Sequence, residues 1–178
     1  PRPNENPYLG GNYAPVEQEL TAFDLRVTGE IPADLEGRWL RNGPNPGSDI
    51  DPAVHHWFLG AGMVHGVRLR GGRAEWYRNR RVVGDDDASP NTNVGGFAGT
   101  TWAMVEAGSP PVELGYELDS LGTNRFFGTL PNGFSAHPKD DPATGELHAM
   151  AYHWPDLVDH VQYVVVGSDG RVSKALDI

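Results

Sequence analysis

The chain has 178 residues, of which 38% are hydrophobic and 21% charged, a composition typical of one globular domain or of part of a larger one. It contains no cysteine, which excludes a disulfide scaffold, a cysteine–zinc site, an iron–sulfur cluster and a thiol nucleophile, so that any bound metal must be held by His, Asp or Glu. The net charge of −10 argues against general binding to nucleic acid or to an anionic membrane.

The amino-terminal part is expected to be extended and rich in turns. Residues 1–36 are rich in Pro, Gly and acidic residues and are expected to form a lead-in, whereas residues 37–178 form the folded part. Shortly after Asn42 come Pro44 and Pro46. These ring residues predict a turn and exclude a central strand at this point.

A β-hairpin and a series of short strands are expected next. Residues 64–70 alternate between apolar and polar, the Gly-Gly pair at 71–72 supplies a two-residue turn, and residues 74–79 form the returning strand. Further strands are expected at 100–105, 114–118, 125–130, 147–152, 161–166 and 171–178. No stretch of about ten residues shows sustained helical periodicity. The pattern indicates an antiparallel all-β chain, and propeller blades, a sandwich and a barrel all fit it.

Arginines are concentrated in the region of the hairpin, and two interpretations of them are open. They form a phosphate-binding face, or they are the outward half of amphipathic strands. We favour the strand interpretation, because Arg68 and Arg70 alternate with Val67 and Leu69.

Histidines are the main candidates for chemistry, since the chain has seven of them. Their spacing alone predicts no metal site. His137 differs by its setting between Ala136 and Pro138, which biases its backbone toward a rigid, extended conformation. Glu106 follows an apolar run and precedes a small residue, so it is the carboxylate best suited to orient a metal-binding imidazole. The competing interpretation of His137 is a packed or surface histidine without a metal, and that of Glu106 is a solvated carboxylate at the end of a strand.

Several motifs, in their order and spacing, resemble the amino-terminal part of carotenoid cleavage oxygenases, the family that includes the retinal pigment epithelial membrane protein. The motifs are 6–9 (NPYL), 11–16 (GNYAPV), 35–46 (LEGRWLRNGPNP), 55–58 (HHWF), 62–66 (GMVHG), 76–80 (WYRNR), 91–93 (NTN), 105–108 (VEAG) and 136–139 (AHPK). Each motif alone is a weak signal, but together they span nearly the whole chain.

The resemblance implies a seven-bladed β-propeller, of which residues 37–178 would form the amino-terminal blades. It implies a non-haem Fe(II) cofactor held by four His, three of which are oriented by Glu. His137 matches the first iron ligand. Glu106 matches a Glu that orients a different iron-binding His, which would lie beyond residue 178. Thr92 matches a Thr that reaches toward the open coordination side, although a β-turn hydroxyl is an equal alternative.

The implied activity is that of an oxidoreductase, a dioxygenase that uses O2 to cleave a conjugated C=C bond of a carotenoid or apocarotenoid into two carbonyl products. Family enzymes are longer, and the sequence stops within an expected strand, so we expect the natural protein to continue and this part alone to be inactive. His55, His56 and His65 belong to the family motifs without being iron ligands, and we expect structural roles for them.

Three positions depart from the family pattern. Ala61 stands where members commonly have an Asp before Met63. Lignostilbene-type members have a Lys and a Tyr where this chain has Val105 and Arg81. The apolar residue at 105 favours a carotenoid or apocarotenoid over a hydroxystilbene.

Two other functions stay open at this point. The chain is a lignostilbene-type dioxygenase, or it is a non-catalytic β-module of the same ancestry that binds an apolar ligand or a partner chain. The expected partners are an apolar polyene substrate and O2, and no nucleic acid. We expect a cytoplasmic location, because residues 1–7 lack the apolar run of a secretory signal, with any peripheral membrane contact made by segments outside this chain.

Overall fold

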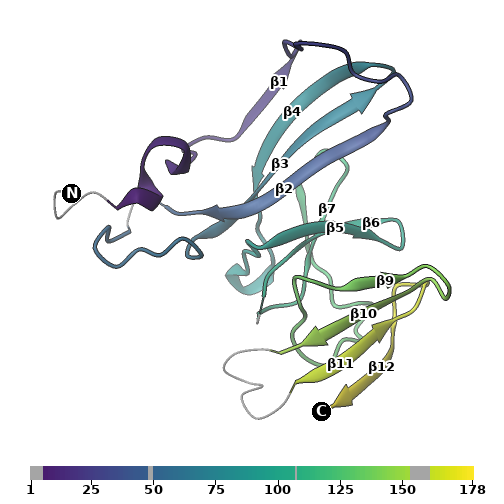
Figure 1. The fold of residues 1–178 in the computed structure, drawn as a ribbon. Helices are drawn as coiled ribbons and strands as arrows, with labels where there is room; N and C mark the ends of the chain where they lie inside the picture. Colours follow the sequence, from purple (N-terminus) through teal and green to yellow (C-terminus); the bar gives the residue numbers. More distant parts are fainter. Residues whose placement is uncertain (1–5, 48–49, 107, 153–160) are drawn as a thin grey trace.

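A computed structural model of the chain describes residues 6–47, 50–106, 108–152 and 161–178. The strands in these ranges form three four-stranded antiparallel sheets, which follow one another through the molecule (Figure 1). We call them blade 1, blade 2 and blade 3 in chain order. Short 3-10 helices lie outside the sheets, namely η1 (Pro7–Leu9), η2 (Gly11–Tyr13) and η3 (Asp85–Asp87). Within the described ranges no helix has the length and apolar character needed to cross a bilayer.

Blade 1 has the strand order β1-β4-β3-β2. Its strands are β1 (Leu20–Phe23), β2 (Gly37–Asn45), β3 (Ala61–Arg70) and β4 (Arg73–Arg81). The expected hairpin is present as β3 and β4, and both glycines of its turn, Gly71 and Gly72, have positive φ. Strand β1 pairs with β4, so the segment 1–36 contributes an edge strand to blade 1. The division of the chain after residue 36 stays a prediction.

The turn expected after Asn42 is absent. Strand β2 instead continues to Asn45, with Asn42 opposite Val64 and Pro44 opposite Gly62. Proline cannot donate a ladder hydrogen bond, but β2 is an edge strand and needs partners on one side only. The prediction of a turn was therefore wrong, whereas the exclusion of a central strand holds.

Blades 2 and 3 have the strand orders β5-β6-β7-β8 and β9-β10-β11-β12. The strands of blade 2 are β5 (Asn93–Phe97), β6 (Thr100–Met104), β7 (Val112–Leu114) and β8 (Ser120–Thr123). Those of blade 3 are β9 (Lys139–Asp141), β10 (Glu146–Ala151), β11 (Gln162–Val166) and β12 (Val172–Asp177). The strands expected near 100, 147, 161 and 171 are thus confirmed as β6, β10, β11 and β12.

Two expected strands are wrong in whole or in part. Residues 125–130 form turns, in which Phe126 and Phe127 have φ of 51° and 57° and Gly128 N–H donates to the Arg125 carbonyl at 3.0 Å. Positive φ is incompatible with a strand, although the apolar content of this stretch resembles one. Residues 114–118 contain only the end of β7, after which the chain turns back into β8.

Two apolar cores hold the blades together. The core between blades 1 and 2 contains Val64, Trp76, Val82, Ala103, Val112, Leu114 and Leu118. The core between blades 2 and 3 contains Trp102, Met104, Phe126, Leu130, Phe134, Ala136, Leu147, Ala149, Ala151, Val164 and Val166. Because side chains alternate along β6, Ala103 enters the first core and Trp102 and Met104 the second. Blade 2 is therefore buried on both faces, which explains its continuous apolar run.

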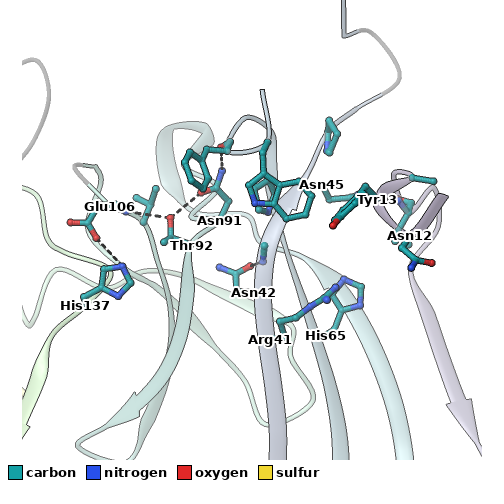
Figure 2. A pocket seen from close by; sticks show the side chains of 18 residues that line it. Asn12, Tyr13, Arg41, Asn42, Asn45, His65, Asn91, Thr92, Glu106 and His137 are labelled. Carbon is teal, nitrogen blue, oxygen red and sulfur yellow. Dashed lines mark hydrogen bonds and ion pairs between the residues drawn. The ribbon is translucent and has the colours of Figure 1, made fainter. Parts of the chain in front are cut away.

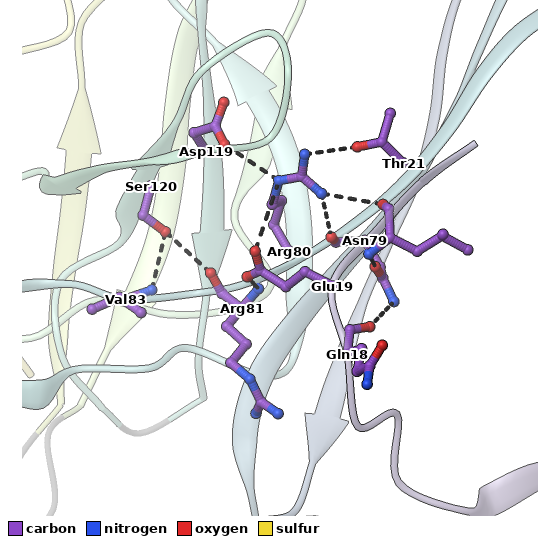
Figure 3. A network of polar contacts seen from close by, with 10 residues as sticks. Gln18, Glu19, Thr21, Asn79, Arg80, Arg81, Val83, Asp119 and Ser120 are labelled. Atoms are coloured by element: carbon purple, nitrogen blue, oxygen red, sulfur yellow. Dashed lines mark hydrogen bonds and ion pairs between the residues drawn. The ribbon is translucent and has the colours of Figure 1, made fainter. Parts of the chain in front are cut away.

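The arginines of blade 1 form polar contacts at its border with blade 2. Arg38 donates to the Tyr116 carbonyl at 2.8 Å, and Arg78 lies 2.5 Å from a Glu117 carboxylate oxygen. Arg80 lies between Thr21 of β1 and Asp119 of blade 2 (Figure 3). The side chains of Arg78 and Arg80 are only 18% and 16% exposed. The interpretation of the arginines as an outward strand face holds for Arg70, whose side chain is 59% exposed. It was wrong for Arg78 and Arg80, because a facing loop with carboxylates covers them.

The all-β prediction is confirmed, and the arrangement decides among the three architectures that the sequence left open. A sandwich has two facing sheets and a barrel has one closed sheet. Here three small, separate antiparallel sheets pack face to face in series, which is the arrangement of propeller blades. The chain therefore forms the amino-terminal blades of a propeller, as expected.

Two adjacent phenylalanines test the importance of the second core. Phe126 is 0% exposed and packs against Trp102 and Phe134, whereas Phe127 is 71% exposed. We expect Phe126→Ala to lower the free energy of unfolding by about 3–5 kcal/mol, because it leaves a large cavity. Urea denaturation measures this loss. Phe127→Ala is the control, because Phe127 has a similar backbone conformation but an exposed side chain, and it should lower the free energy of unfolding by less than about 1 kcal/mol. Similar losses in the two variants would contradict the packing described.

Candidate functional site

A cavity of about 850 Å³ lies where all three blades meet the amino-terminal segment. Figure 2 shows the side chains that line it, among them all three residues singled out from the sequence, Thr92, Glu106 and His137. Aromatic side chains of the lead-in and of the β2–β3 connection also line the cavity, including Tyr13 and Trp57, whose rings pack edge to face. Polar and charged side chains, among them Arg41 and His65, also line it, so the cavity wall is mixed in character.

His137 lies two residues before β9, the edge strand of blade 3. Its Nε2 is 3.4 Å from Oε2 of Glu106 (Figure 2). Its backbone N–H donates to the Ser135 hydroxyl at 3.3 Å, and Pro138 follows it. The side chain is 61% exposed, so the imidazole is accessible from the cavity that it lines.

Glu106 directly follows the apolar run of β6 and is held by a residue that the sequence did not identify. Its Oε1 accepts a hydrogen bond of 2.5 Å from the Tyr152 hydroxyl. This bond is the main reason that the pKa of Tyr152 is raised, with burial adding to it. Sequence reasoning missed Tyr152 because the pairing joins blades 2 and 3 across 46 residues, and no local motif marks it.

The other carboxylate oxygen of Glu106 is buried without a hydrogen-bond donor among the described residues. Its 3.4 Å contact with His137 does not have hydrogen-bond geometry. A buried acceptor without a donor is costly, so this oxygen is suited to a further N–H group or a cation. The resemblance implied that Glu106 orients a different His, whereas among the described residues it is His137 whose imidazole lies 3.4 Å from this oxygen.

Thr92 is bonded to the residues on either side of it in the cavity wall, Asn91 and Glu106. It lies just before β5, its N–H donates to the Met104 carbonyl at 3.0 Å, and its hydroxyl donates to Asn91 Oδ1 at 3.2 Å. The same hydroxyl accepts from the Glu106 N–H at 3.4 Å. Thr92 thus makes local structural bonds and also lines the cavity, while its role beside an open coordination side stays a prediction.

His65 also lines the cavity, but it and His148 contact tyrosine hydroxyls rather than Glu106. His65 Nδ1 lies 2.8 Å from the Tyr77 hydroxyl, and His148 Nδ1 lies 2.6 Å from the Tyr163 hydroxyl, each across a strand pair. His153 and His160 lie outside the described residues. The part of the chain that the structure describes contains no cluster of three or more His, Cys, Asp or Glu that could hold a metal ion.

The donor chemistry at His137 and Glu106 fits part of a metal centre. Neutral imidazole is a good ligand for iron and other first-row divalent ions, and carboxylates commonly orient such ligands. An ion pair between His137 and Glu106 with a purely structural role does not explain why one oxygen of Glu106 is buried without a hydrogen-bond donor. One imidazole does not complete a coordination shell, so a metal ion held here would need further ligands from outside the described residues.

Comparison with known proteins places this site in context. The family model described as "Retinal pigment epithelial membrane protein" matches residues 13–178. A carotenoid cleavage oxygenase of Mycobacterium tuberculosis is 49% identical, with 98% of this chain and 39% of that protein covered. A carotenoid 9,10(9',10')-cleavage dioxygenase of Arabidopsis thaliana is 32% identical, with 96% of this chain and 40% of that protein covered. The chain thus spans about two fifths of the length of these relatives.

Solved structures show the same fold. A lignostilbene dioxygenase of Pseudomonas brassicacearum matches with a TM-score of 0.86 at 26% identity, covering 99% of this chain and 43% of that one. A cobalt-substituted Synechocystis apocarotenoid oxygenase (ACO) matches with a TM-score of 0.73 at 20% identity, covering 92% of this chain and 43% of that one. At 20% identity the likeness shows the fold alone, while the cobalt substitution indicates that this neighbour has a metal site.

The half-buried imidazole of His65 makes stability depend on pH. Burial, and then the charge of Arg41, lowers its pKa in the folded state below the ordinary value of 6.5. The unfolded chain therefore binds the proton more readily, and this contribution to stability is lost as the pH falls below about 6.5. We expect urea denaturation to show a smaller loss of unfolding free energy between about pH 8 and about pH 5 in His65→Gln than in the wild type.

Arg41→Gln is the companion variant for this prediction. It removes the second cause of the lowered pKa and keeps the imidazole, so it should reduce the acid-induced loss only in part. An equal loss in the wild type and in His65→Gln would show that His65 is not responsible.

Proposed function

Because the chain belongs to the retinal pigment epithelial membrane protein family of carotenoid cleavage oxygenases, we propose that its natural protein is a dioxygenase of carotenoids or apocarotenoids. The reaction adds O2 across one conjugated C=C bond, which breaks to give two carbonyl products. The activity is proposed for the whole protein, since the chain spans 39% and 40% of the two relatives described above. The observation that carries the proposal is the meeting of His137, Glu106 and Thr92 on one cavity.

We further propose that His137 is a ligand of Fe(II), together with ligands from outside the described residues. When bound, ferrous iron supplies the activation of O2, which needs no acid–base pair or nucleophile from the protein. Glu106 accepts hydrogen bonds and compensates positive charge, and Tyr152 holds its carboxylate in place. Thr92 keeps the Glu106 backbone fixed and offers its hydroxyl to the cavity.

The apolar part of the cavity wall suits an apolar substrate. Trp57, Phe58 and Val105 line it, and its volume of about 850 Å³ is in the range of pockets that enclose small ligands. An apolar wall excludes water and gains free energy from burial of the polyene surface. Val105 directly precedes Glu106 in the sequence. Its side chain is apolar and cannot bind the hydroxyl of a phenolic substrate.

Lignostilbene cleavage is the second candidate. The solved lignostilbene dioxygenase has a TM-score of 0.86 to this chain, and a resveratrol cleavage oxygenase of Chaetomium globosum is 33% identical. The relative with 49% identity is a carotenoid cleavage oxygenase, and the apolar Val105 agrees with that substrate class. Carotenoid cleavage is therefore the better supported function.

The two candidates predict opposite substrate preferences for the natural full-length protein. We expect kcat/KM for an apocarotenal to exceed that for a hydroxystilbene such as resveratrol by at least about tenfold, since Val105 stands where lignostilbene-type members have a Lys to hold the phenol. Product formation measured for the two substrates side by side checks this. Val105→Lys should narrow the difference, and a higher kcat/KM for the hydroxystilbene in the wild type would reverse the assignment.

Metal analysis of the natural full-length protein tests the role of His137. We expect His137→Ala to lose most of its iron and at least about a hundredfold of its apocarotenal cleavage, because a ligand is removed from the centre. His148→Ala is the matched control, since its imidazole bonds Tyr163 away from the cavity, and it should keep both iron and activity. Unchanged iron in His137→Ala, or no iron in the wild type, would favour a non-catalytic β-module instead.

A further inference from the structure

Two asparagine side chains link the edge strands of successive blades. Asn42 of β2 donates from Nδ2 to the Pro90 carbonyl at 2.9 Å and to the Asn93 carbonyl at 3.2 Å. Asn93, the first residue of β5, donates from its own Nδ2 to the Ala136 carbonyl at 2.7 Å. The series therefore runs from blade 1 through blade 2 and ends at the peptide group between Ala136 and His137.

The backbone partners determine the orientation of both amides. Oδ1 of Asn42 accepts from the Gly43 N–H at 3.0 Å, and Oδ1 of Asn93 accepts from the Val94 N–H at 2.8 Å. In each case an N–H group faces the oxygen and carbonyl groups face the nitrogen. A flipped amide would place like groups together, so only one orientation satisfies the bonds.

The peptide preceding His137 is held more firmly than its imidazole. The Ala136 carbonyl accepts from Asn93, the His137 N–H donates to Ser135, and Pro138 restricts the backbone that follows. Ala136 is 0% exposed and Ser135 5%, whereas the His137 side chain is 61% exposed and touches Glu106 alone among the charged groups of the described residues. The direction in which the imidazole leaves the backbone is thus set by bonds to the peptide rather than by packing around the ring.

We propose that Asn93 is a positioning residue for the metal ligand His137, and that Asn42 supports it. The Asn93 amide fixes the Ala136–His137 peptide plane, because rotation of this plane would break the 2.7 Å bond and swing the His137 side chain. Asn42 holds the carbonyls on either side of residues 91–92, and so fixes the segment that carries Thr92 and leads to Asn93. This inference rests on the proposed metal-binding role of His137.

Metal affinity of the natural full-length protein tests the inference. Asn93→Asp has the same shape and keeps the acceptor for the Val94 N–H, but it loses the donor to the Ala136 carbonyl. Asn93→Ala loses both bonds. We expect the dissociation constant for Fe2+, and for Co2+ used as a spectroscopic probe, to rise about tenfold or more in each variant. The visible absorption bands of bound Co2+ should also change in position or intensity, because the coordination geometry is distorted.

Asn79→Ala is the matched control for a merely structural effect. Asn79 is 2% exposed, and its side chain likewise bridges backbone groups, accepting from the Leu20 N–H at 2.5 Å and donating to the Gln18 carbonyl at 3.4 Å. It tethers the lead-in to β4 away from His137. We expect the melting temperature of the metal-free protein to fall in Asn79→Ala and in Asn93→Ala, with metal affinity and Co2+ spectrum altered only in the Asn93 variants.

The outcomes separate the inference from the function on which it rests. If His137→Ala loses the metal while both Asn93 variants, or the one that folds, bind Fe2+ and Co2+ as the wild type does, the positioning role is refuted and the metal role stands. Equal losses of affinity in Asn79→Ala and Asn93→Ala refute it too. If His137→Ala binds metal as tightly as the wild type, the proposed function itself is refuted.

Discussion

The burial of blade 2 on both faces is the constraint on which the rest of the structure depends. A four-stranded sheet has two faces, and in β6 Ala103 points to blade 1 while Trp102 and Met104 point to blade 3. Burial of such side chains contributes about 1.5–3 kcal/mol each for the larger ones. This two-sided packing fixes the spacing between the sheets, and with it the distances between groups that different blades supply.

The candidate site follows from that packing. Thr92 precedes β5 and Glu106 follows β6, so both lie at the same end of blade 2. His137 precedes β9 and Tyr152 follows β10, which places them at the corresponding end of blade 3. In antiparallel sheets the start of one strand and the end of its neighbour share an edge. Stacking the two blades in the same orientation therefore brings Thr92, Glu106 and His137 to one cavity (Figure 2), and it places the Tyr152 hydroxyl within hydrogen-bond distance of Glu106.

Polar side chains add directional hydrogen bonds and ion pairs between neighbouring blades, next to the apolar cores. Arg38, Arg78 and Arg80 of blade 1 bind carbonyls and carboxylates of the 115–119 loop, while Asn42 and Asn93 connect the edge strands near the cavity. Such bonds have directional geometry, whereas apolar packing tolerates small shifts. They are suited to holding the loop that carries His137 at a defined position.

The sequence by itself determined the all-β class, the β3–β4 hairpin, four of the eight strands of blades 2 and 3 (β6, β10, β11 and β12), and Thr92, Glu106 and His137 as candidate residues. These rest on local signals: alternation, turn residues, and motifs that resemble a known family. Tertiary structure alone decided that β2 continues through Pro44, that Phe126 and Phe127 occupy a turn, that the arginines face a loop, and that Tyr152 and Asn93 contact the candidate residues. Each of these depends on which sheet edge or loop lies opposite, and a contact between residues some forty positions apart leaves no periodic trace in the sequence.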